Sequence, residues 1–403
     1  MPVSPAAAPP QDASTAHGAL GVLFAALGVL SGAWGVHIPS LQKTYGMDEG
    51  GLALALFAAG LGALASLFFS GRIVAWLGTR DTLRLTGWLM LGSLAAVLLW
   101  PHRLLLLAAM VLFGMVISVH DVALNAEGTA LEALRGRPLL AGLHALFSFG
   151  AMAGALLCAA LLRLGWSGPV QLALVSAALA LVLWRSAPHV LDAHPAAPGG
   201  DDSRHFVWPR GPLLLIGLLI FAGMLAEGVM ADWSVLFLQQ ALDWPQDRAA
   251  IGYAIFAGAM AFTRLLADRA RARWGDEPLL PASGALAAAA MALSLTWTTP
   301  ATALAGLAAV GIGLAPVVPL LYAAASRVPG STSAAALGAV SSIGYSGFVL
   351  GPPLMGGLAQ MLTLPKAMWT VAVAATLLAL GALALRRSPG VQTSPAPPSP
   401  SSP

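Results

Sequence analysis

The stretch GRIVAWLGTR at residues 71–80 has a degenerate second copy, TRLLADRARARWG, at residues 263–275. Each copy is short and basic, is flanked by long apolar runs, and lies about fifty residues into its half of the chain. A parallel repeat of this kind predicts two similar halves, with a solute site at the interface between them.

The composition around these basic stretches indicates that the chain lies in a membrane. Charged residues make up 9%, hydrophobic residues make up 58%, and the mean hydropathy is +0.80. A soluble globular domain carries about 25% charged residues. Since 9% cannot cover a water-facing surface on a chain of 403 residues, most of the protein must be surrounded by lipid.

Twelve apolar runs are long enough to cross a bilayer, which takes about 20 residues for a core of about 30 Å. The sequence therefore predicts an all-α membrane protein with twelve transmembrane helices in two six-helix bundles. Most joining loops are short, so consecutive helices should be antiparallel neighbours. The predicted spans are 18–37, 50–70, 84–100, 103–125, 139–163, 168–186, 212–238, 248–266, 279–298, 301–322, 335–361 and 364–386.

Polar stretches divide the chain into five parts. The N-terminal stretch has no basic residue before the first apolar run, which argues against a cleaved signal and for a retained first span. The central linker is rich in Pro and Gly, and the C-terminal tail is a Pro/Ser low-complexity segment. The predicted parts are a disordered tail at 1–17, bundles at 18–186 and 212–387, a linker at 187–211 and a disordered tail at 388–403.

The distribution of cations predicts the orientation. If both termini lie on one side, that side holds fifteen of the twenty Lys and Arg residues and the other side holds five. Cytoplasmic loops carry the excess of Lys and Arg. We therefore expect both termini in the cytoplasm of a cell with a bacterial-type inner membrane.

The two basic loops resemble the loop signature of the major facilitator superfamily, Gly-x-x-x-Asp-Arg/Lys-x-Gly-x-Arg/Lys. The first copy matches at Gly71, Gly78 and Arg80, but Ala75 occupies the position of the acid. In that superfamily the loop latches the cytoplasmic side of the outward-open state. The resemblance thus implies a gating role for these residues. Because Ala75 replaces the acid, we expect the first loop to hold the cytoplasmic side closed less strongly.

The second copy keeps Asp268 and Arg269 and lacks the leading glycine. The resemblance implies the same gating role for this pair. An alternative reading of the whole basic loop is that its arginines only retain positive charge inside the cell.

Within the superfamily the chain is most similar to the bacterial branch related to fucose permease. Two departures leave both proton coupling and export open: the body of span 4 has no Arg, and span 5 has Gly150 and Gly154 but no Gly-Pro pair. We expect those two glycines to serve close helix packing. The similar segments are WGVHIPSLQ (34–42), HDVALNAEGTALE (120–132), GLHALFSFGAMAGA (142–155), EGVMADWSVLFL (227–238) and GYSGFVLGPPLMG (344–356).

Span 4 carries Asp121 and Asn125 on one helical face. A lipid-facing carboxylate costs several kcal/mol, so this face should look inward. Counting from Leu104 places Asp121 roughly 26 Å along the helix, in the cytoplasmic third. Asp121 is either a proton or cation site in the pathway, with Asn125 beside it, or a tie between the helix end and the arginines of loop 2–3.

Span 5 carries His144 and Ser148, four residues apart and on one face. The short loop between spans 4 and 5 allows an Asp121–His144 pair. An imidazole beside a carboxylate titrates near neutral pH and can pass a proton. The alternative is a hydrogen-bonded strut between helices.

Span 7 carries Glu227 near the midplane, with small residues on its face that leave room for a solute or water. Asp232 points some 140° away from it and lies beside Trp233 near the outer interface. We expect extracellular gating, an ordinary boundary role or solute contact for Asp232. His37 and Trp34 end span 1 on the outer side, as pathway residues or as interfacial ones.

Span 11 contains Pro352 and Pro353, which remove two backbone donors and permit bending. Ser341 and Tyr345 on the same helix are candidates for solute contact. Pro316 and Pro319 predict a similar kink in span 10.

These residues favour a secondary transporter that works by alternating access, with a proton symporter for a small polar, sugar-like solute as the leading version. With no clear pathway arginine, a carboxylate or phosphate solute is disfavoured. An exporter of amphipathic compounds and a non-transporting sensor or scaffold are the alternatives. We expect a monomer whose partners are the solute, a proton or cation and the bilayer. We expect no enzyme activity, cofactor, metal or nucleic acid.

Overall fold

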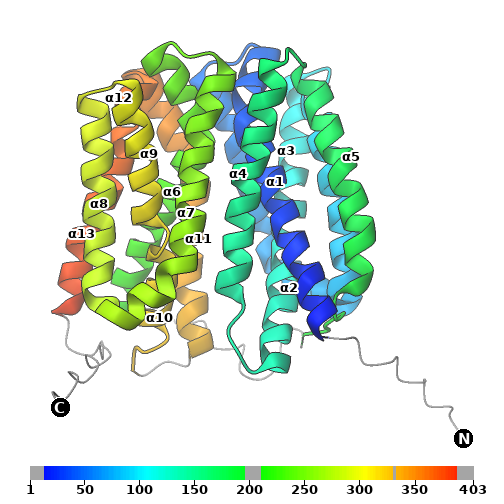
Figure 1. The fold of residues 1–403 in the computed structure, drawn as a ribbon, viewed down its shortest axis with the longest axis vertical. Helices are drawn as coiled ribbons and strands as arrows, with labels where there is room; N and C mark the ends of the chain where they lie inside the picture. The colour runs from blue at the N-terminus through cyan, green and yellow to red at the C-terminus, as the bar shows by residue number, and fades with distance from the viewer. Residues whose placement is uncertain (1–12, 196–209, 330–332, 388–403) are drawn as a thin grey trace, which may run out of the picture.

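The computed structural model describes residues 13–195, 210–329 and 333–387, and it is built from long helices with short connections (Figure 1). The helices are α1 (Ala13–Tyr45), α2 (Glu49–Ala96), α3 (Arg103–Arg135), α4 (Leu140–Arg163), α5 (Gly168–Ser186), α6 (Pro212–Leu242), α7 (Gln246–Trp274), α8 (Asp276–Thr296), α9 (Pro300–Leu314), α10 (Val317–Ala325), α11 (Ser333–Met361), α12 (Leu364–Ala367) and α13 (Trp369–Arg386).

The segment labelled α2 consists of two helical arms that join at Gly78, and it crosses the membrane twice. Thr86 bonds His120 of α3 at 2.8 Å, while Ala59 abuts Gly114 of the same helix. In a straight helix Ala59 and Thr86 would be separated by about 40 Å, whereas Gly114 and His120 are only about 9 Å apart. Both contacts are satisfied because the chain reverses at Gly78, whose φ of 79° and ψ of 163° suit glycine.

This reversal accounts for the twelve crossings. Ten helical segments of the described chain are long and apolar enough to span a bilayer, α9 and α10 together forming one of them and α12 and α13 another. Counting both arms of α2 and adding α11 gives the twelve-helix arrangement that the sequence predicts.

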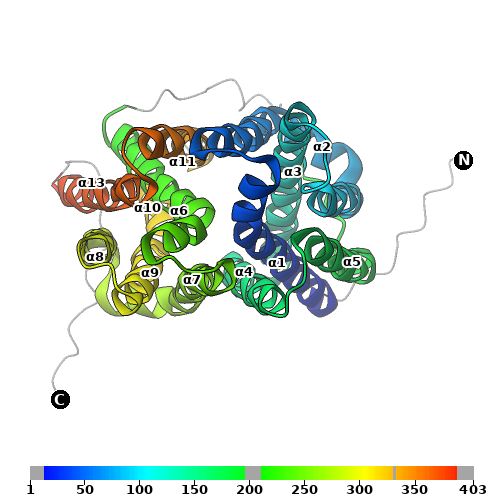
Figure 2. The ribbon, with the colours of Figure 1, turned by 90° about the horizontal axis from the view of Figure 1, so that it is seen from above.

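Two bundles stand side by side in the membrane plane (Figure 2). Helices α1 to α5 form the first half and α6 to α13 form the second. Across the interface α4 packs on α7, α2 packs on α11, and α1 touches α6 near the centre.

The ends of the molecule are unequal. Both chain termini leave from one end, which we call the terminus end, and it also holds the turn at Gly78. The opposite end, called the far end, holds the loops around Gly46, Trp100 and Trp166. Since both termini share one side, the number of crossings is even, as the sequence predicts.

Several helix boundaries differ from the predicted spans because helices continue beyond the apolar core into polar surroundings. Helix α1 already begins at Ala13, within the predicted disordered tail, and α3 continues to Arg135. Span 10 breaks at Pro316, as predicted, into α9 and α10. Most of the predicted linker (196–209) and the tail at 388–403 lie outside the described residues.

Small residues bring α1 and α4 into backbone contact. A Cβ atom added to Gly150 would lie 2.1 Å from the Ala25 carbonyl oxygen, and one on Gly154 would lie 2.3 Å from that of Val29. This close approach confirms the packing role predicted for Gly150 and Gly154.

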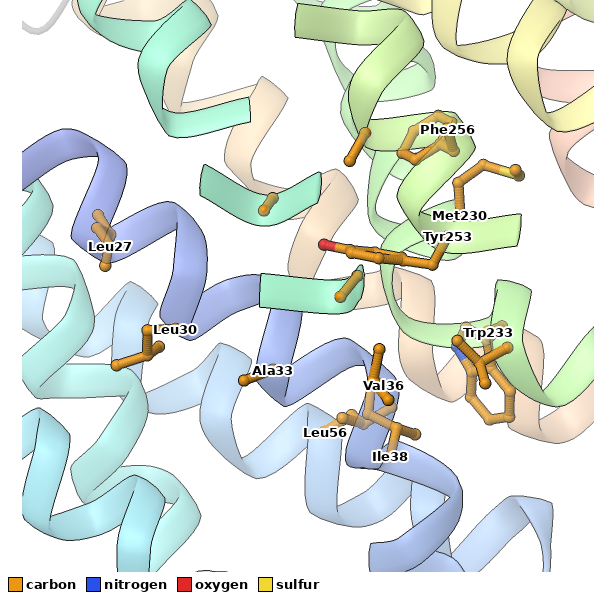
Figure 3. Close-up of a cluster of buried hydrophobic side chains, with 14 of the residues drawn as sticks. Leu27, Leu30, Ala33, Val36, Ile38, Leu56, Met230, Trp233, Tyr253 and Phe256 are labelled. Carbon is orange, nitrogen blue, oxygen red and sulfur yellow. The ribbon is translucent and has the colours of Figure 1, made fainter. Parts of the chain in front are cut away.

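An apolar cluster continues from the first half into the second, with Val36 and Ala33 of α1 near Tyr253 of α7 and Met230 of α6 (Figure 3). The halves are thus packed together by apolar side chains on the far-end side of the interface.

Candidate functional site

The guanidinium of Arg264 bridges the two halves. Its Nη1 donates to Ser148 Oγ on α4 at 2.6 Å, and its Nη2 donates to Glu227 Oε1 on α6 at 3.2 Å. The side chains of Arg264 and Glu227 are only 17% and 22% exposed, and Ser148 is buried. Glu227 is the midpoint of α6, so this ion pair lies deep between the bundles.

Sequence reasoning assigned Arg264 to the cations of the terminus side, and the structure corrects that assignment. Helix α7 continues as far as Trp274, so Arg264 belongs to the body of the helix and its side chain points back along it. The residue also lies within the predicted span 248–266, which was the available signal. Sequence reasoning thus missed an arginine that lies deep between the two bundles.

His144 pairs with Asn125 instead of Asp121. Its Nε2 lies 3.2 Å from Asn125 Oδ1, and the Asn125 amide also donates to the Asp121 backbone oxygen at 2.9 Å. The ring of His144 packs edge-on against Phe24 at 5.4 Å. Among the described residues no ion pair joins Asp121 to His144 or to an arginine of loop 2–3.

Asp121 is two residues past the midpoint of α3, because this helix continues to Arg135, beyond the predicted span. The depth expected for Asp121, in the cytoplasmic third of the membrane, stays a prediction. Asp121 lies within electrostatic range of Tyr345 on α11 of the second half.

Helices α11, α10 and α6 carry the polar groups of the second half that lie near this site. On α11, Ser341 is one turn before Tyr345, and it donates to the Tyr322 hydroxyl of α10 at 3.1 Å. On the far-end side of Glu227, Asp232 lies within electrostatic range of Tyr253. Asp232 and Glu227 thus approach the same tyrosine although they point in different directions along α6.

His37 and Trp34 are engaged within the first half. The His37 ring lies 3.1 Å from Gln171 Oε1 on α5 and 3.0 Å from Ser40 Oγ, and it is buried. Trp34 packs on Phe113 at 5.6 Å and borders a water-sized cavity of about 10 Å³. The interfacial position considered for His37 is therefore wrong, because burial against Gln171 removes it from the lipid boundary.

The first basic loop is held by the segment that follows α5. Arg80 forms an ion pair with Asp192 at 3.4 Å, and the Thr79 N–H donates to the Ala193 carbonyl at 2.9 Å. Buried Glu127 of α3 accepts from Thr79 Oγ1 at 2.5 Å and from the N–H of Leu191. Asp192 and Glu127 thus provide the acids that Ala75 does not.

The second basic loop is organised around Asp276. Arg271 contacts its two oxygens at 2.8 and 3.1 Å, and Arg327 lies 3.2 Å away. Arg269 is exposed, and the side chain of Asp268 lies outside the described residues. A gating role for Gly71, Gly78, Arg80, Asp268 and Arg269 stays a prediction.

Glutamine side chains close the far end between the halves. Gln246 of α7 donates to the Val36 carbonyl at 2.7 Å and to Ser40 Oγ at 2.9 Å. Gln240 reaches Glu49 at 3.0 Å, and Gln360 reaches Asp48 at 2.9 Å. Away from the far end, the Arg264–Ser148 bond deep between the bundles is the one hydrogen bond between the halves that the described residues make.

The family model described as Major Facilitator Superfamily matches residues 20–344 and 255–402. The chain belongs to the Major Facilitator Superfamily. Members of this superfamily are transporters and not enzymes, in agreement with the sequence prediction.

Two relatives of this superfamily member match along nearly all of their length. An uncharacterised MFS-type transporter of Yersinia pestis is 31% identical over 368 residues, covering 91% of this chain and 94% of that protein. An uncharacterised transporter of Sinorhizobium fredii is 30% identical over 369 residues, covering 89% and 95%.

Solved structures of the superfamily share the fold. The nucleoside transporter NupG superposes with a TM-score of 0.73 at 16% identity (92% of this chain, 99% of that one), and a D-xylose–proton symporter with 0.72 at 15% (94% and 98%). The Escherichia coli fucose:proton symporter FucP gives 0.62 at 15% (92% and 98%). Together with the family model, these likenesses bear out the predicted fold and the superfamily resemblance.

Proposed function

We propose that this superfamily member is a proton-coupled secondary transporter that moves a small polar, sugar-like solute by alternating access. The observation that carries the proposal is the Arg264–Glu227 ion pair, which lies deep between the halves and is bridged to Ser148 of the opposite half. Two of the fold relatives are described as sugar–proton symporters.

The ion pair provides a means of coupling. Protonation of Glu227 would remove the negative charge that holds Arg264 Nη2, and Arg264 could then change partners. Asp121, which lies within electrostatic range of Tyr345 on α11, is a second candidate proton site. Both carboxylates lie away from lipid, where an ionisable group can exchange a proton with a water-filled path.

The asymmetry of the interface supports alternating access. Among the described residues, five hydrogen bonds hold the far end between the halves: four are donated by Gln240, Gln246 and Gln360, and one is donated by Ser40 to Gln246 Oε1. We assign this arrangement to the state that is closed at the far end. Without Arg264 the bias of cations in the sequence is fourteen to five, and it further supports placing the protein in the inner membrane with both termini in the cytoplasm.

The test uses purified protein in liposomes that carry an imposed pH gradient and a pH-sensitive dye. A library of sugars and related polar solutes is added, and solute entry and proton entry are followed together. Glu227→Gln and Asp121→Asn should uncouple the two flows, whereas Asp81→Asn, an acid-to-amide change at an exposed position, should behave as wild type. Solute entry that responds to the gradient equally in Glu227→Gln, Asp121→Asn and wild type would refute proton coupling through these carboxylates.

A further inference from the structure

Arg264 has more hydrogen-bond donors than partners. A guanidinium carries five N–H groups in a planar fork. One donates to Ser148 and one to Glu227, and in the part of the chain that the structure describes the remaining three N–H groups have no partner. The Nε–H, which is one of these three donors, is not sealed away, because Arg264 Nε does not belong to the fully buried side-chain atoms that lack a partner in the described chain.

We propose that Arg264 binds a carboxylate group of the transported solute, in the place where it now binds the Ser148 hydroxyl. The solute class is then a small hydroxylated carboxylic acid, such as a sugar acid, in place of a neutral sugar. This inference rests on the proposed transport function and narrows its substrate class.

The chemistry of a guanidinium group favours an acidic solute over a neutral one. Carboxylates match the guanidinium fork with two parallel, charge-assisted bonds. Neutral hydroxyls can be bound by uncharged amides, without the desolvation cost of a partly buried charge. Arg264 is also the least exposed of the arginines that form ion pairs in the described chain, so its charge is largely withdrawn from solvent screening.

The neighbouring acids fit the other end of such a solute. Asp121 on α3 and Tyr345 on α11 lie within electrostatic range of each other, and both side chains can accept hydrogen bonds from hydroxyl groups. Asp232 lies further toward the far end, within electrostatic range of Tyr253. A proton on Glu227 would compensate the incoming negative charge, so that proton and acid enter together without changing the net charge of the site.

Thermal-shift measurements on the detergent-purified protein test the inference with matched probes. D-glucuronate and D-glucosamine each differ from D-glucose in one group, a carboxylate and an amine respectively. Gluconate and sorbitol form an open-chain pair of an acid and a neutral polyol. We expect the acids alone to stabilise wild type. Arg264→Lys, which keeps the charge but loses the fork, should weaken acid binding about tenfold to a hundredfold. Arg248→Gln, on the exposed far-end part of α7, is the matched control and should bind like wild type.

The outcomes separate this inference from the proposed function. Stabilisation by glucose, sorbitol or glucosamine but by neither acid overturns the inference, and so does acid binding that is unchanged in Arg264→Lys and in Arg264→Gln. A panel in which no acid stabilises wild type also overturns it. Acid binding that depends on Arg264, without gradient-driven uptake in liposomes, would sustain the inference and refute the transport proposal.

Discussion

The side-chain amide of Gln360 donates a hydrogen bond of 2.9 Å to the Asp48 carboxylate and joins the two halves across 312 residues of sequence. The same carboxylate accepts from the Gly51 N–H at 2.8 Å and so caps α2. One exposed acid therefore both begins a helix of the first half and contacts α11 of the second.

The far-end contact should withstand moderate acid. The Gly51 N–H, and after it the Gln360 amide, lower the pKa of Asp48 from its ordinary value of 3.8. A lowered pKa means that the contact is complete above 3.8 and is lost only as the pH falls through the lowered value. Spin labels at Lys43 and Met361, with Cys158 replaced by alanine, should report an unchanged distance from about pH 8 to about pH 5. A transition within that window would contradict the assignment of Asp48.

Gln246→Ala should open the far end. The substitution removes the hydrogen bonds to Val36 and Ser40, which together contribute about 1–3 kcal/mol. The same spin-label pair should then show a growing population at longer distance. Gln239→Ala provides the control. Gln239 and Gln246 line one open pocket at the far end, but Gln239 makes no hydrogen bond within the described chain. Equal effects of the two variants would exclude a specific role for Gln246.

Arg264 and Glu227 should be strongly coupled in stability. Either Arg264→Gln or Glu227→Gln leaves one partly buried charge uncompensated, whereas the double variant removes both charges. We expect each single variant to lose about 1–3 kcal/mol and the double variant to lose less than the sum, with a coupling of about 1–2 kcal/mol. Denaturation of all four proteins in the same detergent measures the cycle. Additive losses would show that the ion pair does not form in solution.

Gly78→Ala should release the segment after α5 from the basic loop. A Cβ atom there would lie 2.6 Å from His194 Nε2 and 2.7 Å from Asp192 Oδ1, on a backbone with φ of 79°. The combined strain should cost about 1–3 kcal/mol. Faster proteolysis near residues 190–195 would report the release. Gly92→Ala, on the same helix with open space around it, should leave the digestion rate unchanged.

The lengths of the apolar runs predict the membrane-crossing helices well, because a lipid-facing helix must satisfy its backbone hydrogen bonds within itself. The same rule says little about the residue at which a helix begins or ends. Arg135 lies ten residues beyond the predicted end of its span, because a helix that leaves the apolar core can continue in polar surroundings. Asp121 is therefore two residues past the midpoint of α3, although it lies near the end of the predicted span.

The site could be predicted only in part, because its contacts join distant parts of the chain. Glu227 and Ser148 stood out as polar residues in apolar helices, but their common partner lies 37 residues from one and 116 from the other. No helical period relates such positions. The pairing of Arg80 with Asp192 is equally remote, at a separation of 112 residues, and compensates for Ala75 in a way that the loop motif alone could not reveal.

The Arg264 bridge joins an ion pair within one half to a neutral hydroxyl of the other half. Opposite charges attract over many ångströms in a medium of low dielectric constant, so pulling them apart would demand much work. A hydroxyl bond is short-ranged and is lost with a small displacement. When the two bundles pivot, cation and anion travel together, and the movement breaks a hydrogen bond without separating charge.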